Sequence, residues 1–316
     1  RKEYTPAFSA CLMSSTQHQH LKGYNYAITA MALWGAFPVY WKWLQTVDTI
    51  EVLAHRTIWC ALFTLLVLYQ QKRLTLDLLL VRPVREWLVL TASAVMIACN
   101  WGLFIWAVHH DFAIEASMGY FLSPLVSIML GWLVFREQLR ALHWIAIFLA
   151  AIGVLVQIIS VGATPWLGLM ISMSFATYGA LRKFASADSM TGLLIETLIL
   201  TPAAIAYLIW LEVAGGGMSF IFAGPGLTFL LLMSGVVTAV PLMLYVASTR
   251  LLALSVVGFL FYINPTLQFL IGRFIFGEPF SGGQLAGFAL IWLGLLIFTA
   301  ESLRRRKRNG VRQRIA

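Results

Sequence analysis

Ten apolar runs of about 20 residues each follow one another along this chain, and they limit its fold more than any other feature. A helix of about 20 apolar residues crosses the hydrocarbon core of a bilayer, which is about 30 Å thick. Hydrophobic residues make up 60% of the chain and charged residues 11%, against roughly 25% charged residues in soluble domains. We therefore predict an all-α integral membrane protein with ten transmembrane helices, at residues 24–44, 51–70, 87–108, 113–135, 142–160, 165–183, 190–211, 227–249, 254–276 and 284–302.

Lysine and arginine residues are distributed unequally over the short joins between these runs. If the N-terminus is cytoplasmic, 19 of the 22 basic residues fall on cytoplasmic segments. Basic residues are enriched in cytoplasmic loops, so we predict that both termini are cytoplasmic. Residues 1–21 would form a cytoplasmic segment in which Met13 is an alternative start. The tail at 303–316, with its run RRRKRNGVRQR, would bind anionic lipid headgroups.

Two segments of the chain resemble each other at a constant offset. FLSPLVSIMLGWLVFREQ (121–138) aligns with YINPTLQFLIGRFIFGEP (262–279), so that Pro124 matches Pro265 at an offset of 141 residues. The same offset relates other pairs, among them Lys42 and Lys183, Ser93 and Ser234, Glu137 and Glu278, and Gly153 and Gly294. A single offset over half the chain indicates an internal repeat.

The repeat unit contains five of the predicted helices. Because five is odd, the second copy crosses the membrane in the opposite direction to the first. We therefore predict two inverted five-helix repeats, at residues 22–161 and 162–302. Inverted repeats with a binding site near their interface are typical of secondary transporters.

Ionisable residues within the predicted helices are candidates for function, because charge is costly inside a bilayer. We predict two clusters on either side of a central cavity, acting as gates or carrying a coupling proton. The outer cluster consists of Lys42, His55, Arg56 and Glu115. The inner cluster consists of Lys183, Glu196 and Arg250.

Arg56 is predicted to pair with Glu115 and to form part of the outer gate or an anion contact. The alternatives are structural: Arg56 reaches the lipid headgroups, while His55 and Glu196 serve only in packing. Basic residues at the cytoplasmic helix ends are also explained as topology anchors, namely Arg182, Lys183 and Arg250.

Aromatic and amide side chains near the middle of the predicted helices are candidates for lining a solute pathway. A buried indole N–H or phenol O–H needs a polar partner, and an amide is costly in hydrocarbon. The alternative is that each packs against lipid or other helices. Together with Arg56, the candidate substrate-binding residues are Trp34, Asn100, Trp101, Tyr120, Tyr178 and Tyr262.

Several stretches together resemble the EamA-type branch of the drug/metabolite transporter superfamily, in its RarD, chloramphenicol-permease-like group. The stretches are ALWGAFPVYWK (32–42), AHRTIW (54–59), NWGLFIWAV (100–108), EASMGYFLSPLVSIMLG (115–131) and IETLILTP (195–202). The resemblance covers nearly all of residues 22–302. It implies ten helices in two inverted halves, a central cavity, and an inner-membrane permease that exports small organic molecules.

Other classes of protein fit the sequence less well. An intramembrane enzyme would need a nucleophile–base pair or metal ligands at helical spacing, and a sensor would normally need a soluble signalling domain. No nucleotide-binding loop, metal-ligand pattern or nucleic-acid-binding face is present. We expect no cofactor and no metal, and a small organic solute as partner, moved with protons or by facilitated diffusion. The oligomeric state is left open.

Overall fold

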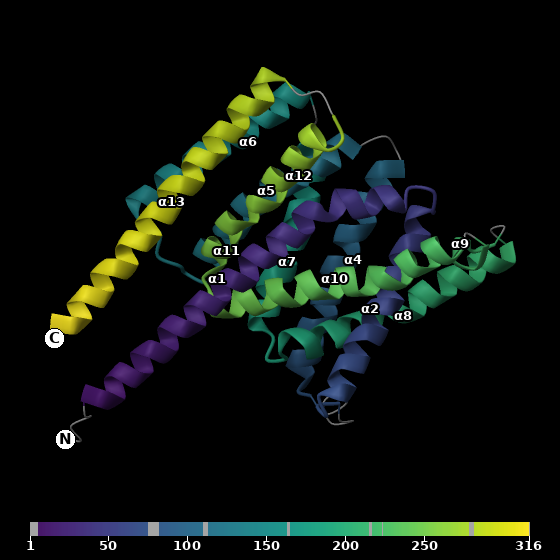
Figure 1. The fold of residues 1–316 in the computed structure, drawn as a ribbon, viewed down its shortest axis with the longest axis horizontal. Coiled ribbons are helices and arrows are strands. Elements are labelled where there is room, and N and C mark those ends of the chain that lie inside the picture. The colour runs from purple at the N-terminus through teal and green to yellow at the C-terminus, as the bar shows by residue number, and fades with distance from the viewer. Residues whose placement is uncertain are drawn as a thin grey trace. The chain divides into compact units, whose positions relative to one another are not determined.

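A computed structural model describes residues 6–74, 82–109, 113–162, 165–214, 217–222, 224–277 and 281–315. These residues form helices joined by short turns, with no strand in the described ranges. The helices are α1 (Pro6–Trp43), α2 (Thr49–Gln70), α4 (Val84–His109), α5 (Ala113–Leu133), α6 (Ala141–Val161), α7 (Pro165–Phe184), α8 (Ser189–Ala214), α9 (Ser219–Phe222), α10 (Pro225–Leu251), α11 (Leu254–Phe261), α12 (Ile263–Phe274) and α13 (Gly282–Ile315). Figure 1 shows their course.

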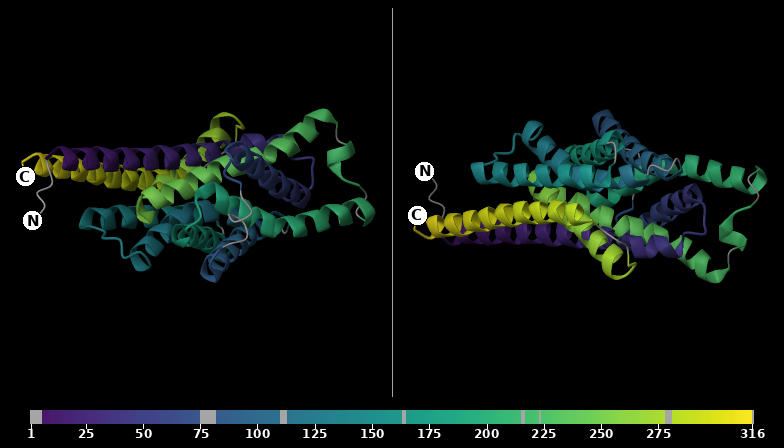
Figure 2. Two further views of the ribbon diagram at one scale, coloured as in Figure 1. Left: turned by 90° about the horizontal axis from the view of Figure 1, so that it is seen from below. Right: turned by 90° about the horizontal axis from the view of Figure 1, so that it is seen from above.

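Seven helical stretches in the described residues are long and apolar enough to cross a membrane, and Met118–Leu133 is a shorter apolar helix. The chain is therefore a multi-pass, all-helical membrane protein. The predicted run at 254–276 is divided into α11 and α12, with Tyr262 at the junction. The join predicted at 215–226 contains the single turn α9, which bridges the ends of α8 and α10 (Figure 2).

The chain forms two compact units, and each takes residues from both halves of the sequence. The first comprises the described parts of residues 1–34, 40–95 and 181–253, and the second those of 35–39, 96–180 and 254–316. In the first unit, α2 packs against both α8 and α10. The contact with α10 is close, because a Cβ atom on Gly235 would lie 2.3 Å from the backbone carbon of Trp59.

The second unit contains two helix pairs, α5 with α11 and α6 with α13. Helices α6 and α13 run side by side (Figure 1). Their backbones approach closely, since a Cβ atom on Gly153 would lie 2.6 Å from the carbonyl oxygen of Gly287. Small residues allow this kind of approach between membrane helices.

Gly153→Ala is expected to lower the thermal midpoint of the purified protein, because the new methyl group must displace backbone rather than a flexible side chain. Overpacking of this kind costs about 1–3 kcal/mol. Gly102→Ala in α4 is the matched control, because nothing lies within 4 Å of the added Cβ atom. An equal decrease in both variants would contradict close packing at Gly153.

Carboxylates cap several helix beginnings. Asp48 accepts hydrogen bonds from the N–H groups of Ile50 and Glu51 at the start of α2, at 2.9 and 3.1 Å. Glu137 accepts from the N–H groups of Leu254 and Ser255 at the start of α11, at 2.6 and 2.9 Å. Glu137 therefore has a helix-end role, whereas its repeat partner Glu278 lies outside the described residues.

Asp188 caps α8, and its titration gives a pH-dependent prediction. Burial raises the pKa of Asp188, but hydrogen bonds from Thr191 and the charge of Arg73, 2.6 Å away, outweigh burial and lower it. A lowered pKa in the folded state means that stability gained at neutral pH is lost as the pH falls through that pKa. Asp188→Asn should reduce this acid-induced decrease in thermal midpoint, by less than about 1 kcal/mol because the pair is exposed. An unchanged acid profile would contradict this assignment.

Candidate functional site

A fully buried ion pair lies within the first unit, between the end of α7 and the first half of α8. The Nε atom of Arg182 is 3.4 Å from Oε1 of Glu196, and the two side chains are 0% and 1% exposed. The same Glu196 oxygen accepts a hydrogen bond from the hydroxyl of Ser93 on α4, which is also buried. Three helices thus contribute to one buried polar centre, which we call the Arg182 centre: Arg182, Glu196 and Ser93.

The space for the Arg182 guanidinium comes from a missing side chain on α8. A Cβ atom on Gly192 would lie 2.0 Å from Nη1 of Arg182. Nη2 donates to the carbonyl oxygens of Asp188 and Ser189 at 3.1 and 3.4 Å. Nη1 has no hydrogen-bond partner in the described part of the chain. Such a pair is held in place by its surroundings, and removing one partner leaves an uncompensated buried charge.

This geometry corrects the interpretation of Arg182 as a topology anchor at a helix end. An anchor would extend into the aqueous or headgroup layer, whereas Arg182 is among the largest fully buried side chains. The ion-pair partner of Glu196 is therefore Arg182, which the predicted inner cluster omitted.

The two other basic residues of the predicted inner cluster contact backbone carbonyl groups. Lys183 donates from Nζ to the carbonyl oxygen of Leu252 at 3.3 Å. Arg250 donates to the carbonyl oxygens of Ala187 and Ser186 at 2.8 and 3.1 Å. Both residues thus fasten the turns that flank α8 and α10, close in sequence to the Arg182 centre.

The predicted outer cluster is present only in part. Arg56 donates from Nε to the hydroxyl of Thr238 at 3.1 Å, and its guanidinium carbon lies 5.4 Å from the ring centroid of Trp41. His55 is buried, and Lys42 is exposed at the end of α1. The Glu115 side chain lies outside the described residues, so the Arg56–Glu115 pair stays a prediction.

The predicted substrate-binding residues fall into both units. Trp34 belongs with Arg56 to the first unit, where its ring centroid is 5.6 Å from that of Tyr245. In the second unit, Asn100 donates from Nδ2 to the carbonyl oxygen of Ile171 at 2.7 Å and contacts the Ser174 hydroxyl at 3.1 Å. The costly amide is therefore satisfied within the protein.

The aromatic candidates of the second unit differ in exposure. Trp101 and Tyr120 are half-buried, and the Tyr120 ring lies 6.2 Å from Phe104. Tyr178 and Tyr262 are completely buried. The Tyr262 hydroxyl has no hydrogen-bond partner in the described ranges, and the ring packs in an apolar cluster. The polar partner predicted for this mid-helix tyrosine is therefore absent from the described structure.

Sequence reasoning missed three further groups of the first unit, Glu51, Glu212 and Phe220. Glu51 is 2% exposed and accepts the backbone N–H of Phe220 at 3.2 Å. Glu212 accepts the backbone N–H of Met218 at 2.9 Å. The glycine-rich join between α8 and α10 hid these contacts, because nothing in its composition predicts the turn α9.

Comparison with known proteins gives a consistent assignment. Residues 21–159 match the EamA-like transporter family. The chain is 38% identical to protein RarD of Escherichia coli over 92% of this chain and 98% of that protein. It is 36% identical to an uncharacterized transporter of Vibrio cholerae, over 92% and 96% of the two chains. A chloramphenicol-sensitive protein RarD of Pseudomonas aeruginosa is 33% identical over 92% and 98%.

A crystal structure with 15% sequence identity has the same fold, with a TM-score of 0.69 over 87% of this chain and 96% of the other. The named relatives are transporters or RarD proteins rather than enzymes. Their similarity extends over most of the chain, including both the Arg182 centre and α9.

Proposed function

We propose that this chain, which belongs to the EamA-like transporter family and to its RarD group, is a proton-coupled secondary transporter. It exports small amphipathic organic solutes across the inner membrane by alternating access. The observation that carries the proposal is the completely buried Arg182–Glu196 pair, because intramembrane ionisable residues mark ion and substrate pathways. Both termini are cytoplasmic in this proposal, and the basic tail contacts anionic lipid.

Helix boundaries support the proposed inverted repeat. Helices α5 and α11 begin at Ala113 and Leu254, which are 141 residues apart. Helices α6 and α13 begin at Ala141 and Gly282, at the same separation. The ends of α1 and α7 are also 141 residues apart. The family match at 21–159 corresponds closely to the first proposed repeat, residues 22–161.

Contacts between repeat-related helices also support the inverted arrangement. A Cβ atom on Gly153 of α6 would meet the carbonyl oxygen of Gly287 on α13 at 2.6 Å. One on Gly294 of α13 would meet the carbonyl oxygen of Ala146 on α6 at 2.7 Å. The offset of 141 converts the first contact into the second with the helices exchanged. A two-fold axis in the membrane plane produces this kind of reciprocity.

Glu196 is the proposed carrier of the coupling proton. When Glu196 is ionised, its carboxylate pairs with Arg182 and accepts from Ser93. Protonation neutralises the carboxylate and removes its attraction for the guanidinium, so that the proton favours an arrangement in which α7 and α8 are no longer joined by charge. A proton that binds the two arrangements unequally shifts their populations. The Arg182 centre would in this way link proton binding to alternating access.

One alternative is a uniporter that moves a metabolite by facilitated diffusion. The specific observation in its favour is that Arg182 already neutralises Glu196, so the pair could be purely structural. In that case solute would cross without proton movement. A non-transporting membrane enzyme or sensor is the remaining alternative, and the named transporters among its relatives weigh against it.

The test is solute-dependent proton movement in proteoliposomes that contain a pH-sensitive dye. Chloramphenicol, aromatic amino acids and neutral metabolites are added one at a time under an imposed pH gradient, with protein-free liposomes as the control. Proton movement that requires both protein and solute supports the coupled transporter. Solute movement without protons supports the uniporter, and the absence of any protein-dependent solute movement would contradict both.

A further inference from the structure

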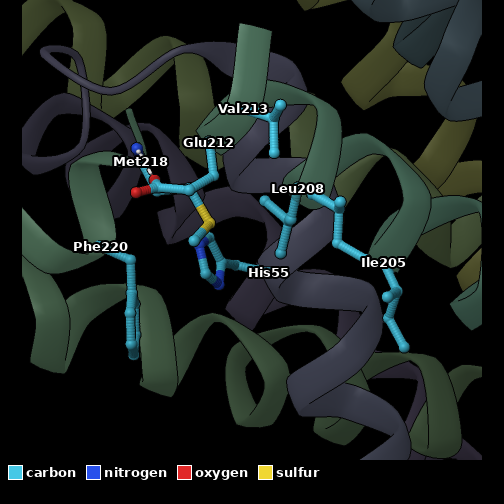
Figure 3. Close-up of a pocket in the computed structure, with 8 residues that line it drawn as sticks. His55, Ile205, Leu208, Glu212, Val213, Met218 and Phe220 are labelled. Carbon is cyan, nitrogen blue, oxygen red and sulfur yellow. Dashed lines mark hydrogen bonds between the residues drawn. The ribbon is translucent and has the colours of Figure 1, made fainter. Parts of the chain in front are cut away.

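A pocket of about 480 Å³ lies within the first unit, between α2, α8 and α9 (Figure 3). One wall consists of aliphatic side chains from α8, namely Ile205, Leu208, Ile209 and Val213. The polar or aromatic groups that line it are His55, Glu212 and Phe220. None of these three groups belongs to the Arg182 centre.

His55 offers an unsatisfied hydrogen-bond donor at this pocket. The indole N–H of Trp59 donates to Nδ1 of His55 at 3.3 Å, so the proton of the neutral imidazole is on Nε2. The Nε2 atom has no hydrogen-bond partner in the described part of the chain. Its nearest carboxylate oxygen, on Glu51, is 3.8 Å away and already accepts from Phe220. A buried donor without a partner is costly, so an acceptor on a ligand would be favoured there.

An aromatic ring system forms another part of the pocket. The Phe220 ring is stacked on the imidazole of His55, with centroids 4.8 Å apart and planes inclined by 23°. It is also stacked with Trp59 at 5.9 Å. Flat aromatic faces next to an aliphatic wall favour a planar apolar body such as a single aromatic ring.

Glu212 supplies a negative charge to the same pocket. It is exposed, and Oε2 accepts the backbone N–H of Met218 at 2.9 Å. No lysine, arginine or histidine forms a salt bridge with it in the described ranges. Its charge therefore remains available to attract a cation on a ligand.

We infer that this pocket binds a small aromatic amine that also carries a hydroxyl group. The ring lies between Phe220 and the aliphatic wall of α8, the ammonium group faces Glu212, and the hydroxyl oxygen accepts from Nε2 of His55. This binding site is independent of the proposed proton coupling, because it uses none of the residues of the Arg182 centre.

Binding of tritiated tyramine to the purified full-length protein in detergent, followed by scintillation proximity, tests the inference. Tyramine contains the ring, the ammonium group and the hydroxyl group. Phenethylamine lacks the hydroxyl group and should compete at least about tenfold more weakly, as expected when a buried donor loses its acceptor. 4-Hydroxyphenylacetate replaces the ammonium group with a carboxylate and should not compete.

Two variants assign these preferences to residues. Glu212→Gln keeps an acceptor for Met218 but removes the charge, and tyramine binding should decrease at least about tenfold. His55→Phe keeps an aromatic ring against Phe220 but removes the donor, so tyramine and phenethylamine should compete equally. Glu301→Gln in the second unit is the matched control and should bind like wild type, and the thermal midpoint of each variant reports its folding.

Equal competition by all three compounds against wild type would overturn the inference. So would unchanged tyramine binding in Glu212→Gln, because the charge of the pocket would then have no role. Since binding is measured without a pH gradient, either result leaves the proposed transport mechanism untouched.

Discussion

Arg182→Met is expected to reduce the free energy of unfolding by about 3–5 kcal/mol, because it leaves the carboxylate of Glu196 buried without a cation. The methionine side chain retains much of the volume, so packing against Gly192 changes less than charge does. The thermal midpoint of the purified protein in detergent measures the effect.

The double variant Arg182→Met/Glu196→Leu is the control for this prediction. Replacing both members of a buried ion pair with apolar groups is often neutral or stabilising, so the midpoint should return most of the way to that of wild type. A double variant as unstable as Arg182→Met would show that charge imbalance is not the cause of the loss.

The same double variant is expected to lose solute transport although it folds. Solute-dependent proton movement in proteoliposomes should fall at least about 100-fold, because neither a titratable carboxylate nor its cation remains at the Arg182 centre. The assay uses the solute that wild type moves. Transport at the wild-type rate by this variant would mean that the pair is structural, and it would favour the uniporter.

The sequence predicts the helical fold because the energetics of a bilayer act on long stretches. An apolar run of about 20 residues has few alternatives to a helix in lipid, since every backbone polar group must be satisfied internally. The break at Tyr262 and the turn α9 depend instead on local packing and on single carboxylates such as Glu51. Those interactions leave no periodic trace in the sequence.

The candidate site was only half accessible to the same reasoning. Glu196 is an acidic residue in the middle of an apolar run, and that isolation is a strong signal. Arg182 stands next to Lys183 at the end of a helix, where basic residues usually report topology. What distinguishes it is the absence of a side chain at Gly192, ten residues later and on the next helix. Only the folded chain brings that gap and the guanidinium together.

The most direct test of the central claim separates exchange from net flux in Glu196→Gln. If Glu196 carries the coupling proton, this variant should still exchange labelled for unlabelled solute across the proteoliposome membrane. It should not drive net solute movement under a pH gradient. Exchange without net proton-driven flux would support Glu196 as the coupling residue of the transporter. Net proton-driven flux at the wild-type rate would contradict that role.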